Sequence, residues 1–90
     1  MKVTWTDEAL LDLVRFQEFL ESYPEVAART IQNLLDVEFM LSPFPRIGTP
    51  LEQYAPAEVR KVFVGQYEIR YELTENGIFI LHVWHTREDR

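Results

Sequence analysis

The strongest pattern in the sequence is an alternation of apolar and charged side chains in its last third. From residue 67 to 73 every second residue is apolar and those between are charged: Tyr67, Ile69, Tyr71 and Leu73 against Glu68, Arg70 and Glu72. A period of two predicts a β-strand that buries one face and exposes the other. We therefore expect a strand over 67–74 whose charged side chains lie in water.

Two further strands flank this one. Gly65-Gln66 separates it from a run over 58–64. Asn76-Gly77, whose residues both tolerate positive φ, predicts a tight hairpin on the other side. In the next run, 78–84, the residues at both odd and even positions are apolar apart from His82. Such a run is typical of a strand inside a sheet. The three strands predict an antiparallel meander that ends in a charged tail over 85–90.

The first 21 residues predict a short strand and a helix. Lys2 to Trp5 is β-prone, and Thr6 is placed to cap a helix that ends near Glu21. Apolar residues of this helix recur every three or four positions: Ala9, Leu10, Leu13, Phe16 and Leu20.

A second helix is expected to start at Ser22–Glu25 and to end near Leu41. Ser22 and Glu25 have capping-box spacing, and Pro24 is tolerated because first-turn N–H groups have no intrahelical partner. Its apolar stripe consists of Ala27, Ile31, Leu34, Leu35 and Phe39. Neither helix can bury its stripe alone, so the pair needs a sheet to cover.

The segment 42–57 is expected to be irregular, because it contains four prolines and Gly48. Its apolar side chains are expected to hold it against the body of the protein: Phe44, Ile47, Leu51 and Tyr54. The predicted fold class is α+β with the order β-α-α-β-β-β, a helical hairpin on one face of a mostly antiparallel sheet. Ninety residues make a single domain, 1–90.

Composition excludes several kinds of site. The chain has no cysteine, which excludes disulfides and thiol catalysis and fits a cytoplasmic protein. With His82 and His85 as its only histidines and no acidic cluster beside them, we expect no metal and no cofactor. No apolar run approaches the roughly 20 residues that span a bilayer, so we expect no membrane association.

The net charge of -6 is unevenly distributed. Residues 1–42 carry three basic and eight acidic side chains, and residues 43–90 carry six basic and seven acidic ones. An acidic chain gains little from counterion release on nucleic acid, so a large phosphate-binding surface is disfavoured. A small basic pocket in the second half stays open.

The sequence resembles the RelE/ParE superfamily, the toxins of bacterial type II toxin–antitoxin systems that are often labelled plasmid stabilisation proteins. Four blocks carry the resemblance, together with the helical hairpin: Pro43–Gly48, Val59–Val62, Tyr67–Tyr71 and Val83–Glu88. The resemblance implies that the first strand, 2–5, lies beside the last, 78–84. It also implies a cognate antitoxin whose extended segment wraps the toxin.

The superfamily implies two possible activities. RelE-like members cut messenger RNA in the ribosomal A site without metal, and ParE-like members inhibit DNA gyrase. The RelE pattern has an arginine after the first tyrosine of the Tyr-x-Ile-x-Tyr strand, where this chain has Glu68, and a downstream tyrosine that this chain lacks. A carboxylate there repels phosphate. Arg87 matches the pattern, Arg60 and Lys61 match loosely, and His85 is a candidate acid or base.

We therefore expect a ParE-like toxin that binds a protein target such as DNA gyrase. Two alternatives stay open: a ribosome-dependent endoribonuclease that uses Arg87, His85 and a basic residue at 60 or 61, and a degenerate relative that only pairs with its antitoxin. The expected binding residues are Arg60, Lys61, Glu68, Arg70 and Trp84. Arg60 and Lys61 have opposite parity, so one of them faces the open side of the sheet. Arg70 is expected to pair with neighbouring acids.

The antitoxin is expected to add a strand to the sheet or to lay a helix across its apolar areas. An unpaired sheet edge would mark the place, and a homodimer could form there.

Overall fold

A computed structural model of the chain describes residues 1–88, so Asp89 and Arg90 of the charged tail lie outside the described residues. Its elements run along the chain in this order: β1 (Val3–Trp5), α1 (Asp7–Phe19), α2 (Pro24–Leu35), α3 (Val37–Leu41), β2 (Thr49–Pro50), the 3-10 helix η1 (Glu52–Tyr54), β3 (Glu58–Val64), β4 (Tyr67–Thr74) and β5 (Gly77–His85).

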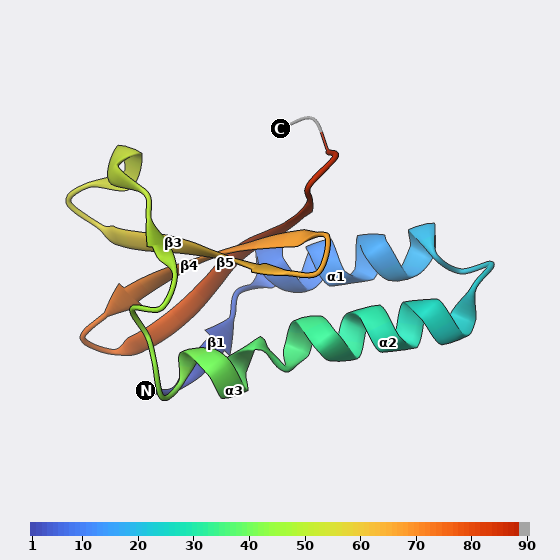
Figure 1. Cartoon of the computed structure of the whole chain (residues 1–90), viewed down its shortest axis with the longest axis horizontal. Coiled ribbons are helices and arrows are strands. Elements are labelled where there is room, and N and C mark those ends of the chain that lie inside the picture. The colour runs from blue at the N-terminus through green and yellow to red at the C-terminus, as the bar shows by residue number, and fades with distance from the viewer. Residues whose placement is uncertain (89–90) are drawn as a thin grey trace.

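The five strands form one sheet in the order β1-β5-β4-β3-β2. β3, β4 and β5 are the predicted antiparallel meander, and β1 pairs in parallel with β5, with Val3 opposite Ile78. Figure 1 shows α1 and α2 as an antiparallel hairpin on one side of this sheet. The predicted fold class and the pairing of the first strand with the last are confirmed.

The core lies between the helices and the sheet. Its fully buried large side chains come from both layers: Leu34, Leu41, Ile69, Tyr71, Ile78, Ile80 and Val83. Leu41 belongs to α3 and was not among the predicted stripe residues. The others occupy predicted apolar positions of α2 and of the meander, because each layer buries its apolar face against the other.

The helices differ from the sequence prediction in three ways. Thr6 caps α1 as predicted, since Ala9 N–H donates to Thr6 Oγ1 at 3.3 Å, but Leu10 is 43% exposed. The predicted capping box is wrong, because Tyr23 is the N-cap of α2 and its cap makes no side-chain hydrogen bond. The second helix breaks at Asp36, between α2 and α3. The break changes the direction of the next turn, and Phe39 is 72% exposed instead of buried.

The segment 42–57 contains β2 and η1, so the prediction of a wholly irregular segment is wrong. Phe44 and Ile47 are exposed and do not hold it. The buried Tyr71 holds it instead: its hydroxyl donates to the carbonyl of Pro45 at 2.8 Å and accepts from the N–H of Gly48 at 2.9 Å. Polar bonds to this core phenol therefore take the place of the contacts expected from Phe44 and Ile47.

Both hairpin turns of the meander use a glycine with positive φ. Gly65 has φ +56° in the first turn, and Gly77 has φ +127° at the start of β5. Asn76 does not adopt positive φ, which differs from the prediction for the second turn. Instead, the N–H of Asn76 donates to Oγ1 of Thr74 at 3.0 Å. This bond ties the turn to the end of β4.

Candidate functional site

The face of the sheet turned away from the helices, here called the open face, carries most of the predicted binding residues. In register across the meander, its side chains are Lys61 and Phe63 of β3, Glu68 and Arg70 of β4, and His82 and Trp84 of β5. Each alternates with a residue of the core on the other face, such as Val62, Ile69 or Val83.

Glu68 and Arg70 form an ion pair at the centre of the open face. Arg70 Nε donates to Glu68 Oε2 at 2.7 Å, which confirms the expected pairing of Arg70 with a neighbouring acid. Glu68 is only 2% exposed, so its predicted position in water is wrong. In register it lies between Phe63 and Trp84, two large aromatic residues, and this explains its burial.

The Arg70 guanidinium is also held by aromatic neighbours. Its Nη1 donates to the Tyr54 hydroxyl at 2.8 Å, and its Cζ lies 4.8 Å from the ring centroid of Trp84. Burial alone would lower the pKa of Arg70, but the bonds to Glu68 and Tyr54 outweigh it and raise that pKa. The positive charge of Arg70 is therefore fixed in place and balanced within the protein.

Arg60 and Lys61 lie on opposite faces, and the register places Lys61 on the open one, opposite Arg70. Arg60 turns toward the segment before β2, where its Nη1 donates to the carbonyl of Gly48 at 2.8 Å and its Nε pairs with Glu58 at 3.0 Å. Bonds from Arg46 and Arg60 lower the pKa of Glu58. Arg60 is thus occupied in fixing the loop, and of these two basic residues it is Lys61 that adds its charge to the open face.

Asp12 of α1 contacts β5 at the edge of the open face, a role that the sequence analysis did not predict. β1 pairs with β5 only as far as Ile80, and beyond it Asp12 Oδ2 accepts from the N–H of Val83 at 2.8 Å. The same oxygen lies 3.4 Å from Nδ1 of His82, whose ring stacks on Trp84 with centroids 5.0 Å apart. The only sequence signal was a carboxylate between apolar positions of α1.

His85 and Arg87 lie elsewhere, in a hollow that we call the C-terminal pocket. It has a volume of about 540 Å³ between the end of α1 and the end of β5, and its lining residues are Arg15, Phe16, Phe19, Tyr67, His85, Arg87 and Glu88. His85 is paired in register with Tyr67 and contacts its ring edge-on, with centroids 5.2 Å apart. Tyr67 packs against the helix-side core. The two nuclease candidates therefore lie on the helix side of the sheet, away from Lys61 and Arg70.

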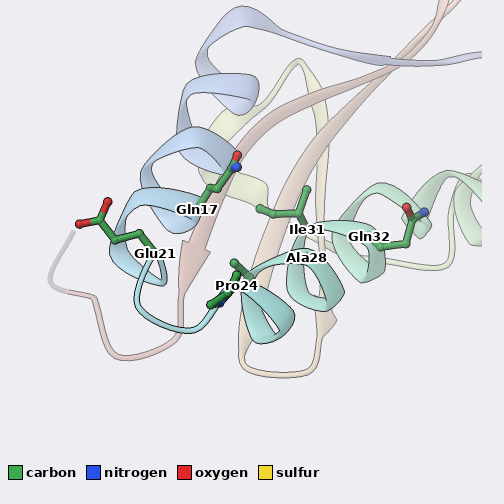
Figure 2. A pocket seen from close by; sticks show the side chains of 7 residues that line it. Gln17, Glu21, Pro24, Ala28, Ile31 and Gln32 are labelled. Carbon is green, nitrogen blue, oxygen red and sulfur yellow. The ribbon is translucent and has the colours of Figure 1, made fainter.

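A smaller hollow of about 360 Å³ lies between the helices (Figure 2). Gln17 reaches it from α1 and Glu21 from the turn after α1, and α2 lines it with Pro24, Ala27, Ala28, Ile31 and Gln32. Its polar side chains are two amides and one carboxylate, so it offers no cation. Within residues 1–88 no group of three or more His, Cys, Asp or Glu side chains is arranged to hold a metal ion. In the same range no helix has the length and apolarity to cross a bilayer.

Comparison with known proteins identifies the family. The sequence model described as "ParE toxin of type II toxin-antitoxin system, parDE" matches residues 3–90. The chain belongs to this ParE toxin family. A solved structure titled "Chromosomal ParDE TA system from P. aeruginosa" has the same fold, with a TM-score of 0.78 and 20% identity over 94% of this chain and 95% of that one. No curated protein matches the sequence. The resemblance to the RelE/ParE superfamily, nearer its ParE branch, is confirmed.

Proposed function

We propose that this ParE-family toxin arrests growth by binding a protein target in the cytoplasm, such as DNA gyrase, and that a cognate antitoxin neutralises it. The observation that carries the proposal is the buried Glu68–Arg70 ion pair on the open face. A surface that cleaves RNA needs cations that are free to meet phosphate. Here the central cation is already balanced by a buried carboxylate.

The placement of the remaining cations supports the same conclusion. Lys61 lies on the open face, whereas Arg87 and His85 line the C-terminal pocket on the helix side. General acid–base cleavage requires its acid, base and phosphate-binding groups around one reacting atom. These three side chains do not surround a common point, so we favour protein binding over catalysis.

One observation favours ribosome-dependent cleavage as the second candidate. The C-terminal pocket brings Arg87 and His85 together with Tyr67 and Arg15, which are side-chain types that metal-independent nucleases use. The bond between Arg15 and Glu88 counts against it, because it neutralises one of the two arginines. The chain's net charge of -6 also opposes binding to a ribosome.

Controlled expression in a bacterial host tests the proposed function. We expect growth arrest that is relieved when the neighbouring reading frame, encoding the antitoxin, is co-expressed. Purified protein added to translating ribosomes should leave messenger RNA intact. Cleavage at codon boundaries that disappears in Arg87→Ala would establish the nuclease instead. Normal growth with a folded protein that binds the antitoxin would identify a degenerate toxin.

A further inference from the structure

The C-terminal pocket has the construction of a site for an apolar side chain. Its walls are aromatic: Phe16 and Tyr67 meet edge to face with ring centroids 4.8 Å apart, and Phe19 forms the outer lip. Phe19 is 83% exposed, more than any other large apolar side chain of residues 1–88. A hollow of about 540 Å³ falls in the size range of pockets that enclose small ligands and anchoring side chains.

The charges at the rim of the pocket indicate the sign of its ligand. Arg15 is already occupied, because it bonds to Glu88 and also to Asp12 at 3.3 Å. The bond to Glu88, which outweighs burial, raises the pKa of Arg15. Within residues 1–88 the Arg87 side chain makes no hydrogen bond and no ion pair, and only its backbone N–H is used, donating to His85 Nδ1 at 3.1 Å. Among residues 1–88, therefore, no carboxylate pairs with the positive charge of Arg87, which lies beside an apolar hollow.

We propose that the C-terminal pocket receives an apolar side chain of the antitoxin, and that a carboxylate next to that side chain pairs with Arg87. This inference rests on the proposed function, because it assigns the surface through which the antitoxin binds. Aromatic and arginine side chains are among the residues that dominate binding energy at protein interfaces. A nucleic acid fits less well, since phosphate binding needs several free cations and the pocket offers one.

Two other parts of the described surface, the centre of the open face and the hollow between the helices, offer less to an apolar segment that carries a carboxylate. The central charges of the open face are balanced within the protein by the Glu68–Arg70 pair. The hollow between the helices carries Glu21 and no cation, so it would repel a carboxylate. Charge complementarity therefore favours the C-terminal pocket over these two parts of the surface.

Isothermal titration of the purified toxin with its full-length antitoxin tests the assignment, with two variants and a matched control for each. Arg87→Glu reverses the rim charge, and Arg29→Glu makes the same change on the exposed surface of α2. Phe19→Asp removes the apolar lip, and Phe39→Asp does so on α3. We expect each pocket variant to weaken binding by about tenfold or more and each control to change it by less than about threefold.

Exchanging the charges of Arg87 and its partner carboxylate between the two proteins then identifies the residue that Arg87 contacts. An antitoxin in which one Asp or Glu is replaced by Lys should bind Arg87→Glu more tightly than the unmodified antitoxin does, a coupling that general loss of folding cannot produce. Circular dichroism of every variant confirms that the toxin is folded.

Wild-type affinity in both pocket variants would overturn the docking site while leaving the proposed function intact. Weakened binding in the Arg29 and Phe39 controls alone would do the same, by placing the antitoxin elsewhere. A concentration-dependent toxin dimer that Phe19→Asp dissolves, with antitoxin affinity unchanged, would assign the pocket to a second copy. A wild-type toxin that fails to bind the antitoxin at all would remove the proposed function and this inference together.

Discussion

Arg70 Nε donates to Glu68 Oε2 across 2.7 Å, on the face of the sheet that the helices leave uncovered. Glu68 is 2% exposed and the Arg70 side chain 18%. The pair therefore belongs to the interior of the protein although it lies on an outer face. A charge pair that is shielded from water in this way affects the stability of the sheet and also determines which ligands its surface can bind.

Loss of the arginine should destabilise the fold. Arg70→Ala takes from the buried Glu68 carboxylate a charged hydrogen bond, and we expect the free energy of unfolding to fall by about 2 kcal/mol. Urea denaturation measures it. Arg29→Ala on the surface of α2 is the control and should change the free energy of unfolding by less than about 0.5 kcal/mol. Equal effects of the two substitutions would show that the ion pair contributes nothing to the free energy of unfolding.

The Tyr71 hydroxyl should contribute a similar free energy of stabilisation by holding the loop that contains Pro45 and Gly48. Tyr71→Phe leaves the N–H of Gly48 and the carbonyl of Pro45 without their partner, and we expect a cost of about 1–3 kcal/mol. Hydrogen exchange at Gly48 should accelerate in the same variant. Tyr23→Phe, at a residue that is 65% exposed, serves as the control. Unchanged protection of Gly48 would mean that other contacts hold the loop.

Stability should fall in alkaline solution because of the buried tyrosines. Burial raises the pKa of Tyr71, and burial together with Glu88 raises the pKa of Tyr67. The folded state thus holds these protons more tightly than the unfolded chain, whose tyrosines titrate near pH 10, at about their ordinary pKa. Their stabilisation is complete below that pH and is lost as the pH rises through the folded pKa values.

Urea denaturation between pH 8 and about pH 11 measures this loss. Tyr67→Phe should lessen the alkaline loss of stability, whereas Tyr23→Phe should leave it unchanged. Wild type and Tyr67→Phe differ only in one hydroxyl, so comparison of the two isolates the tyrosine. A pH dependence identical in wild type and Tyr67→Phe would contradict the assignment.

Gly77 should tolerate no side chain. Its φ of +127° is strained for any other residue, and an added Cβ would lie 2.8 Å from the carbonyl oxygen of Lys2, the residue before β1. Gly77→Ala should therefore cost about 3 kcal/mol or more and loosen β1 from β5. Gly65→Ala has open space around its Cβ and a φ of +56°, so it should cost only about 1 kcal/mol. Thermal unfolding compares the two, and an equal loss would exclude the contact with Lys2 as the cause.

Much of the fold could be predicted because its elements carry periodic patterns. The alternation over 67–73 and the two glycine turns predicted the meander, and the apolar stripes predicted the two helices that pack on it. The break at Asp36 could not be predicted, because no proline or glycine marks it and the apolar spacing continues to Phe39. The burial of Glu68 depends on its neighbours across the sheet, Phe63 and Trp84, which a local pattern does not contain.

The candidate site was predictable only in part for the same reason. The tail residues His85 and Arg87 were identified from the sequence, and they do lie in one pocket. The other wall of that pocket comes from Arg15 and Phe19, about 70 positions earlier in the chain, and only the tertiary fold brings them there. Whether Arg87 lies near the basic residue at 60 or 61, as the nuclease alternative requires, could not be judged from the sequence, since it depends on which side of the sheet each side chain faces.

DNA supercoiling by purified gyrase tests most directly the central claim, that this toxin acts by binding a protein and not by cutting RNA. The account predicts that adding the toxin lowers supercoiling in a dose-dependent way and that prior mixing with the antitoxin restores it. Full supercoiling at every toxin concentration, together with cleavage of messenger RNA on translating ribosomes, would contradict it.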